Sequence, residues 1–293
     1  MFCAKILRRG GDTMADIITE LEKRPFIYRE VLDIPRKANF GLELELDKID
    51  PNVVYKLVRK EFGSRWVVKE DKSLTKGANA EIVSPVLNNT RDTWKVLMRM
   101  GELLERLNPD YSKCSFQVNF DGSILPSVED RVRFLKLYAM YEDIVYRLSQ
   151  GGSGTYRESI EEYAAPIILY LKGGLSISNE ATINLLSNQK RYGIAFKDKD
   201  GKDLIEFRSP NMTSNPIYWQ NYINVFYYML MAASKPKYDK SEVDRYIDHY
   251  YKCYILEDYE REKREKAITF AKVMLPGSTD KSNFFHQYMG RKP

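Results

Sequence analysis

Five short segments of the chain alternate apolar and polar residues with a period of two, which is typical of β-strands with one buried face. In the first, Phe40–Leu46, the leucines share one face with Phe40, and Glu43 and Glu45 share the other. The other four segments are Trp66–Lys69, Asn79–Ser84, Cys114–Asp121 and Ile205–Arg208. Their polar positions concentrate carboxylates, amides and an arginine, where an ordinary wet strand face carries Lys, Thr and Ser.

Apolar residues at helical spacing predict helices around these strands. Asp50-Pro51 is a helix-start signal, because an acidic cap precedes proline at the first helical position. A second cap, Asn215-Pro216, begins a long apolar helix that extends to about Ala233. The remaining predicted helices span residues 15–32, 90–107, 128–149, 241–253 and 256–274, followed by a loose end.

The order of these elements predicts an α+β fold. Tyr192–Lys197 and Leu204–Arg208 flank a turn sequence, Asp198-Lys199-Asp200-Gly201, and therefore predict a hairpin. Hairpins favour an antiparallel or mixed sheet with helices on its apolar face, so the polar faces would line an open cradle. We expect an N-terminal extension (1–35, partly helical), a catalytic domain (36–235) and a charged helical C-terminal extension (236–293).

Composition excludes several kinds of chemistry. The chain of 293 residues has only two histidines and three scattered cysteines, which argues against zinc sites, His-based catalysis and a disulfide framework. The net charge of +5 is too mild to indicate nucleic-acid binding. No apolar run reaches the roughly 20 residues of a membrane span, and we expect a cytoplasmic protein. We also expect that translation starts natively at Met14.

The carboxylates of the polar faces predict a metal site. Glu43 and Glu45 would lie about 7 Å apart along one strand face, and Glu81 and Glu206 would join them from other strands. Such a set could hold paired divalent cations, which lie about 3.5–4 Å apart in phosphoryl-transfer sites. Oxygen ligands suit Mg²⁺ or Mn²⁺. A solvated strand face with ordinary glutamates is the alternative.

Nearby polar residues add candidate partners for nucleotide and phosphate. Gln117 and Asn119 can ligate a metal through oxygen or grip a nucleotide. Arg208, with Lys190 and Arg191 before the preceding strand, can bind phosphate, and the alternative is a cross-strand salt bridge. Two further features have loop interpretations: Asp71-Lys72-Ser73 fits a turn, and Gly151–Gly154, which no Gly-Lys-Ser/Thr follows, fits a mobile lid or linker.

The motifs together resemble those of the putative amidoligase family, within the carboxylate–amine ligase superfamily that includes glutamate–cysteine ligase and glutamine synthetase. The resemblance covers about residues 36–235. The motifs that carry it, in order, are Phe40-Gly41-Leu42-Glu43-Leu44-Glu45; Trp66 with Asp71-Lys72-Ser73-Leu74; Ala80-Glu81-Ile82-Val83-Ser84-Pro85; Cys114-Ser115-Phe116-Gln117-Val118-Asn119; and Ile205-Glu206-Phe207-Arg208 leading into Asn211-Met212-Thr213 and the Trp219 helix.

This resemblance implies an antiparallel funnel that binds ATP and two or three Mg²⁺ ions. ATP would phosphorylate a carboxylate, and an amine would displace phosphate from the acyl phosphate to give an amide or peptide bond. In the implied roles, Arg208, Glu206 and Arg191 are catalytic, and Asp71 and Ser73 lie near the substrate. The implied metal ligands are Glu43, Glu45, Glu81, Gln117 and Glu206, and the implied nucleotide contacts are Gln117, Asn119, Lys190, Arg191 and Arg208.

The chain departs from the family at one strand, where Gln117 and Asn119 replace the usual His-x-His. A catalytically degenerate binding or scaffold protein is therefore an alternative, and a metal-dependent nucleic-acid enzyme is a third hypothesis. The latter predicts a basic groove beside the carboxylates, which the sequence does not show. We expect an amino acid, amine or peptide as substrate, no membrane or nucleic-acid partner, and a homo-oligomer as an option through the C-terminal helices.

Overall fold

A computed structural model of the chain describes residues 24–167, 183, 191–199, 201–234 and 259–290. Within these residues, seven strands form one sheet in which every pairing is antiparallel. The strand order is β2-β3-β1-β5-β7-β6, and β4 pairs with β1. The strands are β1 (Asn39–Asp47), β2 (Val67–Lys69), β3 (Asn79–Val83), β4 (Leu87–Asn88), β5 (Phe116–Asp121), β6 (Ile194–Lys199) and β7 (Lys202–Phe207).

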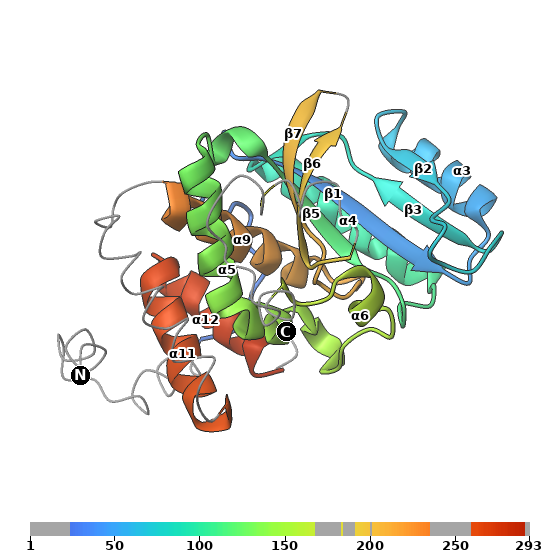
Figure 1. Cartoon of the computed structure of the whole chain (residues 1–293). Coiled ribbons are helices and arrows are strands. Elements are labelled where there is room, and N and C mark those ends of the chain that lie inside the picture. Colours follow the sequence, from blue (N-terminus) through green and yellow to red (C-terminus); the bar gives the residue numbers. More distant parts are fainter. Residues whose placement is uncertain (1–23, 168–182, 184–190, 200, 235–258, 291–293) are drawn as a thin grey trace, which may run out of the picture.

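The longer helices gather on one side of this sheet, which confirms the predicted α+β class (Figure 1). The long helices α5 and α9 pack against each other, and α11 and α12 pack on both of them. The helices are α3 (Pro51–Phe62), α4 (Arg91–Leu107), α5 (Val128–Ser149), α6 (Ile160–Tyr163), α9 (Pro216–Ser234), α11 (Tyr259–Met274) and α12 (Ser278–Tyr288), with short 3-10 turns η1 (Gly122–Ile124) and η2 (Gly151–Ser153).

The predicted helix starts are confirmed by their capping bonds. The Asp50 carboxylate accepts a hydrogen bond of 2.8 Å from the backbone N–H of Asn52, and Pro51 takes the first helical position of α3. Asn215 caps α9 in the same way, through a 3.0 Å bond from the N–H of Ile217. Both caps satisfy backbone N–H groups that a helix end leaves without partners.

Aromatic stacking joins the apolar face of the sheet to the helices. Phe207 of β7 stacks on Phe226 of α9 with ring centroids 4.1 Å apart. Phe116 of β5 stacks on Trp219 of α9, and Phe40 of β1 lies against a tryptophan of α4. These rings are buried, so the apolar face is the core and the opposite, polar face is left for the site.

Two sequence predictions are wrong, and others fall outside the described residues. Residues 24–32 of the predicted 15–32 helix are not helical, because side-chain amides of the folded domain take their backbone groups: Gln220 bonds Arg29 and Asn89 bonds Leu32. The predicted loose end is instead helix α12, whose Phe284 is fully buried. The remaining residues of the 15–32 helix, the 241–253 helix and Met14 lie outside the described residues.

The described part of the predicted C-terminal extension shares one core with residues 36–235. Phe270 of α11 meets Tyr141 of α5 edge to face at 5.0 Å. Asp280 of α12 is buried and binds Arg29 at 2.6 Å and the Asn224 amide of α9 at 2.9 Å. The extension therefore packs against the outer side of the helical layer, away from the polar face of the sheet.

Candidate functional site

The sheet register places the predicted carboxylates and amides on one face. Cross-strand partners in an antiparallel pair point to the same side of the sheet. Glu45 lies opposite Glu81, Glu43 lies opposite Gln117, and Asn119 lies opposite Glu206. We call the face away from the helices the polar face; it carries Glu43, Glu45, Glu81, Gln117, Asn119 and Glu206, all at least nine-tenths buried.

One side of this face holds more positive than negative charge. The fully buried Glu206 is contacted by both the Lys197 ammonium of β6 and the Arg208 guanidinium. Arg208 also donates 3.2 Å to the Gln117 Oε1 and 3.1 Å to the carbonyl of Tyr163. Burial by itself lowers the pKa of Arg208, but the Glu206 carboxylate outweighs it and the net shift is upward. We call Lys197, Glu206 and Arg208 the basic end.

The other side of the face is rich in carboxyls, and one of them keeps its proton near neutral pH. Burial, and then a hydrogen bond and repulsion from the Glu43 carboxyl, raise the pKa of Glu81 to about 8. One cation, the Lys69 ammonium, lies 3.1 Å from Glu81. Asn119 donates 3.3 Å to Glu43, while its own carbonyl Oδ1 is buried with no hydrogen-bond partner among the described residues. We call Glu43, Glu81, Lys69 and Asn119 the acidic end.

Glu45, on the same strand as Glu43 and opposite Glu81, is bound by the protein itself. Its carboxylate accepts 2.6 Å from the backbone N–H of Ser115 and 2.8 Å from the Gln117 amide. Burial raises the pKa of Glu45, and the Ser115 bonds work against that rise. Gln117 thus joins Glu45 to Arg208 across the sheet, and its hydrogen-bonding groups are already engaged.

The donor set fits one divalent cation better than the several that the resemblance implies. No group of three or more His, Cys, Asp and Glu side chains in the described part of the chain is arranged to hold a metal ion. Glu45 and Glu206 are engaged by protein donors. At the acidic end, Glu81 is hydrogen-bonded to the Glu43 carboxyl, and the Asn119 Oδ1 lies nearby with no hydrogen-bond partner among the described residues. Such a set favours a hard cation, because a cation would satisfy the oxygen and relieve the repulsion.

The predicted substrate residues take part in a turn. The Asp71 Oδ1 accepts hydrogen bonds from both the N–H and the hydroxyl of Ser73, while Asn79 accepts from the N–H of Asp71. This is the turn arrangement that the sequence offered as the alternative. Asp71 still contributes to the field at the site, since its charge acts on both Glu45 and Lys69.

The structure does not bring every predicted phosphate partner to the site. Arg191 is exposed just before β6, and its carbonyl accepts 2.7 Å from the N–H of Ala165. Lys190 lies outside the described residues. Arg208 is the predicted partner that reaches the polar face, through its bonds to Gln117 and Glu206.

Sequence reasoning missed three cations at or beneath the face. Lys197 alternates with the apolar Ile194 and Phe196 along β6, so strand periodicity alone could have placed it on the polar face. Lys69 is the last residue of the short strand β2 and contacts Glu81. Arg157 lies in an irregular loop, where no sequence pattern marks it. Lys197 and Lys69 provide part of the positive charge that the sequence analysis expected from metal ions.

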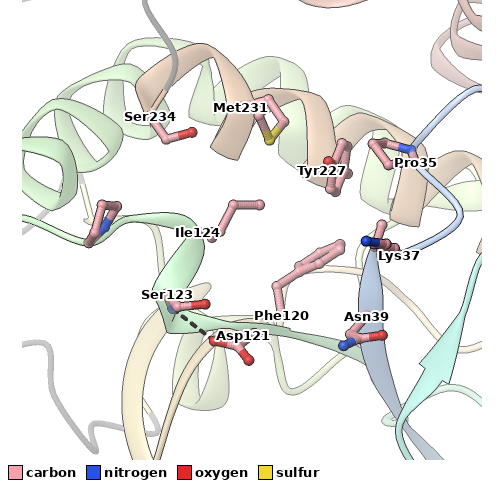
Figure 2. Close-up of a pocket in the computed structure, with 12 residues that line it drawn as sticks. Pro35, Lys37, Asn39, Phe120, Asp121, Ser123, Ile124, Tyr227, Met231 and Ser234 are labelled. Atoms are coloured by element: carbon pink, nitrogen blue, oxygen red, sulfur yellow. Dashed lines mark hydrogen bonds between the residues drawn. The ribbon is translucent and has the colours of Figure 1, made fainter.

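A separate cavity of about 500 Å³ lies between the ends of β1 and β5 and the C-terminal part of α9 (Figure 2). Phe120, Tyr227 and Met231 form its apolar walls, and Asn39 and Asp121 lie along its sheet side. The Asp121 carboxylate is engaged at this edge by the N–H of Ser123 at 2.9 Å. The cavity contains none of the predicted site residues.

Comparisons with known proteins leave the family open. Within the described residues, no helix combines the length and apolar character needed to cross a membrane. A scan against models of protein families found no match, and no curated protein matched the chain.

Proposed function

We propose that the protein is an ATP- and Mg²⁺-dependent carboxylate–amine ligase with a fold of the glutamine synthetase and glutamate–cysteine ligase type. The observation that carries this proposal is that one buried polar face has a cation-rich end and a carboxyl-rich end. At the basic end two cations contact the Glu206 carboxylate, and at the acidic end two carboxyls lie side by side, with Lys69 contacting one of them, Glu81.

The spacing of the two ends suits a metal-bound phosphate chain. Two strand spacings separate Glu43 on β1 from Glu206 on β7, which puts these two strands about 10 Å apart, and Asn119 lies on the strand between them. A ligand with a divalent cation at one end and phosphate oxygens at the other matches both the sign and the span of this arrangement. Non-specific anion binding would need only the basic end, and simple cation binding only the acidic end.

The residues divide the work by charge. Glu43, Glu81 and the Asn119 carbonyl would hold the cation, and Arg208 with Lys197 would hold phosphate oxygens. Bound Mg-ATP would supply the phosphoryl group that activates the substrate carboxylate. Its Mg²⁺ would neutralise part of the charge on the phosphate oxygens. The protein would contribute alignment, fixed charges and exclusion of water, which needs no side-chain nucleophile.

A matched pair of lysine variants tests the binding mode. Lys197→Gln and Lys69→Gln each remove one ammonium that contacts a glutamate of the polar face. Mg-ATP at 100 times its dissociation constant should stabilise the wild type by about 2.7 kcal/mol in thermal unfolding. Lys197→Gln should remove most of that gain, whereas Lys69→Gln should retain it and tighten Mn²⁺ binding in calorimetry. Equal losses in both variants would contradict the assignment of the two ends.

The reaction itself is tested by screening ATP hydrolysis against pooled amino acids, amines and peptides. A ligase should release ADP and phosphate only when both an acceptor amine and a carboxylate are present, and mass spectrometry should find the amide product. Glu43→Gln should abolish the product because it removes one carboxyl of the acidic end. Hydrolysis that continues without any adduct would argue for an ATPase.

A second candidate function is a binding or scaffold protein that has kept the cradle and lost catalysis. This candidate is favoured because protein groups already compensate two of the carboxylates. Glu206 contacts two cations, and Glu45 accepts hydrogen bonds from Ser115 and Gln117. This candidate predicts no change in thermal stability with millimolar Mg-ATP. The lysine pair and the unfolding assay above therefore separate the two functions.

A further inference from the structure

Arg157 is a buried arginine that binds only backbone carbonyls among its described hydrogen-bond acceptors. Its Nη1 donates 2.8 Å to the carbonyl of Ser209 and 3.2 Å to that of Pro210, and its Nη2 donates 2.9 Å to that of Arg208. These three consecutive carbonyls follow the last residue of β7. Arg157 therefore holds the backbone of the segment after β7, which includes Arg208 of the basic end.

The loop that contains Arg157 is tied to the same segment a second time. The Asn211 side chain accepts 3.2 Å from the N–H of Arg157, and its amide donates 2.7 Å to the carbonyl of Thr155 and 3.1 Å to the hydroxyl of Ser153. The glycine-rich run Gly151–Gly154, predicted from the sequence to be a mobile lid or linker, forms η2 and the turn after it. The bond from Asn211 to Ser153 connects this run to the chain that follows β7.

The burial of this guanidinium is costly, which argues against a role in packing alone. Arg157 is only 4% exposed and forms no ion pair within the described residues. Burial is the main cause that lowers its pKa to about 10, and Glu45 offsets that fall only in part. Buried charges without a direct counter-ion are destabilising, whereas a planar fork can fix several acceptors at once.

The clamped segment determines where the Arg208 side chain points. The Arg208 N–H donates 2.8 Å to the carbonyl of Gly193, and its carbonyl is held by Arg157. With both sides of its peptide backbone fixed, its guanidinium reaches Gln117 and Glu206 on the polar face. Loss of the Arg157 fork would free three carbonyls and let the Arg208 backbone shift.

We propose that Arg157 is a positioning residue, which holds the chain after β7 so that Arg208 is aligned for a phosphate-bearing ligand at the basic end. This inference rests on the proposed function for the identity of the ligand. The positioning itself concerns the Arg208 side chain and can be observed without any ligand.

The test compares Arg157→Gln with Arg133→Gln. Arg133 is also a buried arginine that donates to a backbone carbonyl, that of Ala233, but it lies on α5 in the helical layer. Two measurements are made on the full chain: hydrogen exchange of the Arg208 Nε–H by NMR, and the affinity for Mg-ATP by calorimetry. The Nε–H donates to the carbonyl of Tyr163, so its protection reports the side-chain position directly.

We expect Arg157→Gln to accelerate exchange at the Arg208 Nε–H about tenfold and to weaken Mg-ATP binding about tenfold or more. Arg133→Gln should lower the melting temperature and leave both readouts unchanged. Arg157→Lys, which keeps the charge but lacks the planar fork, should behave like Arg157→Gln.

Two results would overturn the positioning role: unchanged Arg208 protection in Arg157→Gln, or normal affinity and protection in Arg157→Lys, which would make the effect one of charge alone. If the wild type binds no Mg-ATP, the proposed function fails, and the exchange measurement still decides the positioning role.

Discussion

Replacing Glu81 with glutamine should reduce the dependence of stability on pH. In the folded protein the Glu81 carboxyl is buried beside Glu43, and its pKa is raised from 4.5 to about 8. A carboxyl whose pKa is raised by folding keeps its proton up to a higher pH in the folded state than in the unfolded state. Its favourable contribution is therefore complete below about pH 4.5, and it is lost as the pH rises through about 8.

The size of the effect follows from this difference in pKa. Each pH unit over which only the folded state retains the proton is worth about 1.4 kcal/mol, so ionisation of Glu81 costs at most about 5 kcal/mol at pH 8.5. Lys69 lies 3.1 Å away and is half-exposed, and local relaxation with water entry lowers the cost of the buried charge. We expect a measured difference of about 2 kcal/mol.

The assay is urea denaturation of wild type and Glu81→Gln at pH 5.5 and pH 8.5, with a chelator present so that no cation neutralises the pair. At pH 5.5, one unit above the unfolded pKa, the two proteins should differ by less than at pH 8.5, with at most about 1.4 kcal/mol of the contribution already lost. At pH 8.5 the variant should be the more stable by about 2 kcal/mol. Adding Mg²⁺ should narrow this gap if the acidic end binds it.

A matched control uses Glu206, another buried glutamate of the polar face. Glu206→Gln removes a carboxylate that has two cation partners, so it should destabilise the protein at both pH values by about 3 kcal/mol or more. The reasoning would be refuted if Glu81→Gln were as destabilising as Glu206→Gln at pH 8.5, since the Glu43–Glu81 pair would then be a net stabilising contact.

Three further predictions concern the scaffold. Asp50→Ala should cost about 1 kcal/mol in urea denaturation through loss of the α3 cap, and Asp50→Asn, which can still cap, should cost far less. Phe226→Ala should cost about 4 kcal/mol, because its ring stacks on Phe207 at 4.1 Å in the core; a loss below 1 kcal/mol would mean that this contact is not packed as described. Gly193→Ala should cost about 2 kcal/mol because the added methyl meets the buried Tyr146 hydroxyl, and combining it with Tyr146→Phe should recover part of that loss, as thermal unfolding would report.

Strand periodicity was sufficient to predict the shared face of the candidate site. Glu43 and Glu45 alternate with leucines, and Gln117 and Asn119 alternate with Phe116 and Val118, so each strand fixes its own polar side. Antiparallel pairing then places those sides together, because opposite residues in a register point the same way. Local caps likewise marked the starts of α3 and α9.

Periodicity could not predict how the charges are compensated. The predicted hairpin pairs β6 with β7, but whether the Lys197 ammonium reaches Glu206 depends on the register of that pair and on the side-chain conformations. The non-helical residues 24–32 and the buried helix α12 were also missed, because partners distant in sequence decide both.

The sequence by itself determined the α+β class, the order of the main strands along the chain and the side of each strand that carries the polar residues. These features follow from local spacing and capping. Only the tertiary structure decided that the polar face has an acidic and a basic end. It did so because the net charge at a buried point is a sum over side chains from several strands. It also decided the place of Arg157, whose contacts with the chain after β7 join residues about fifty positions apart.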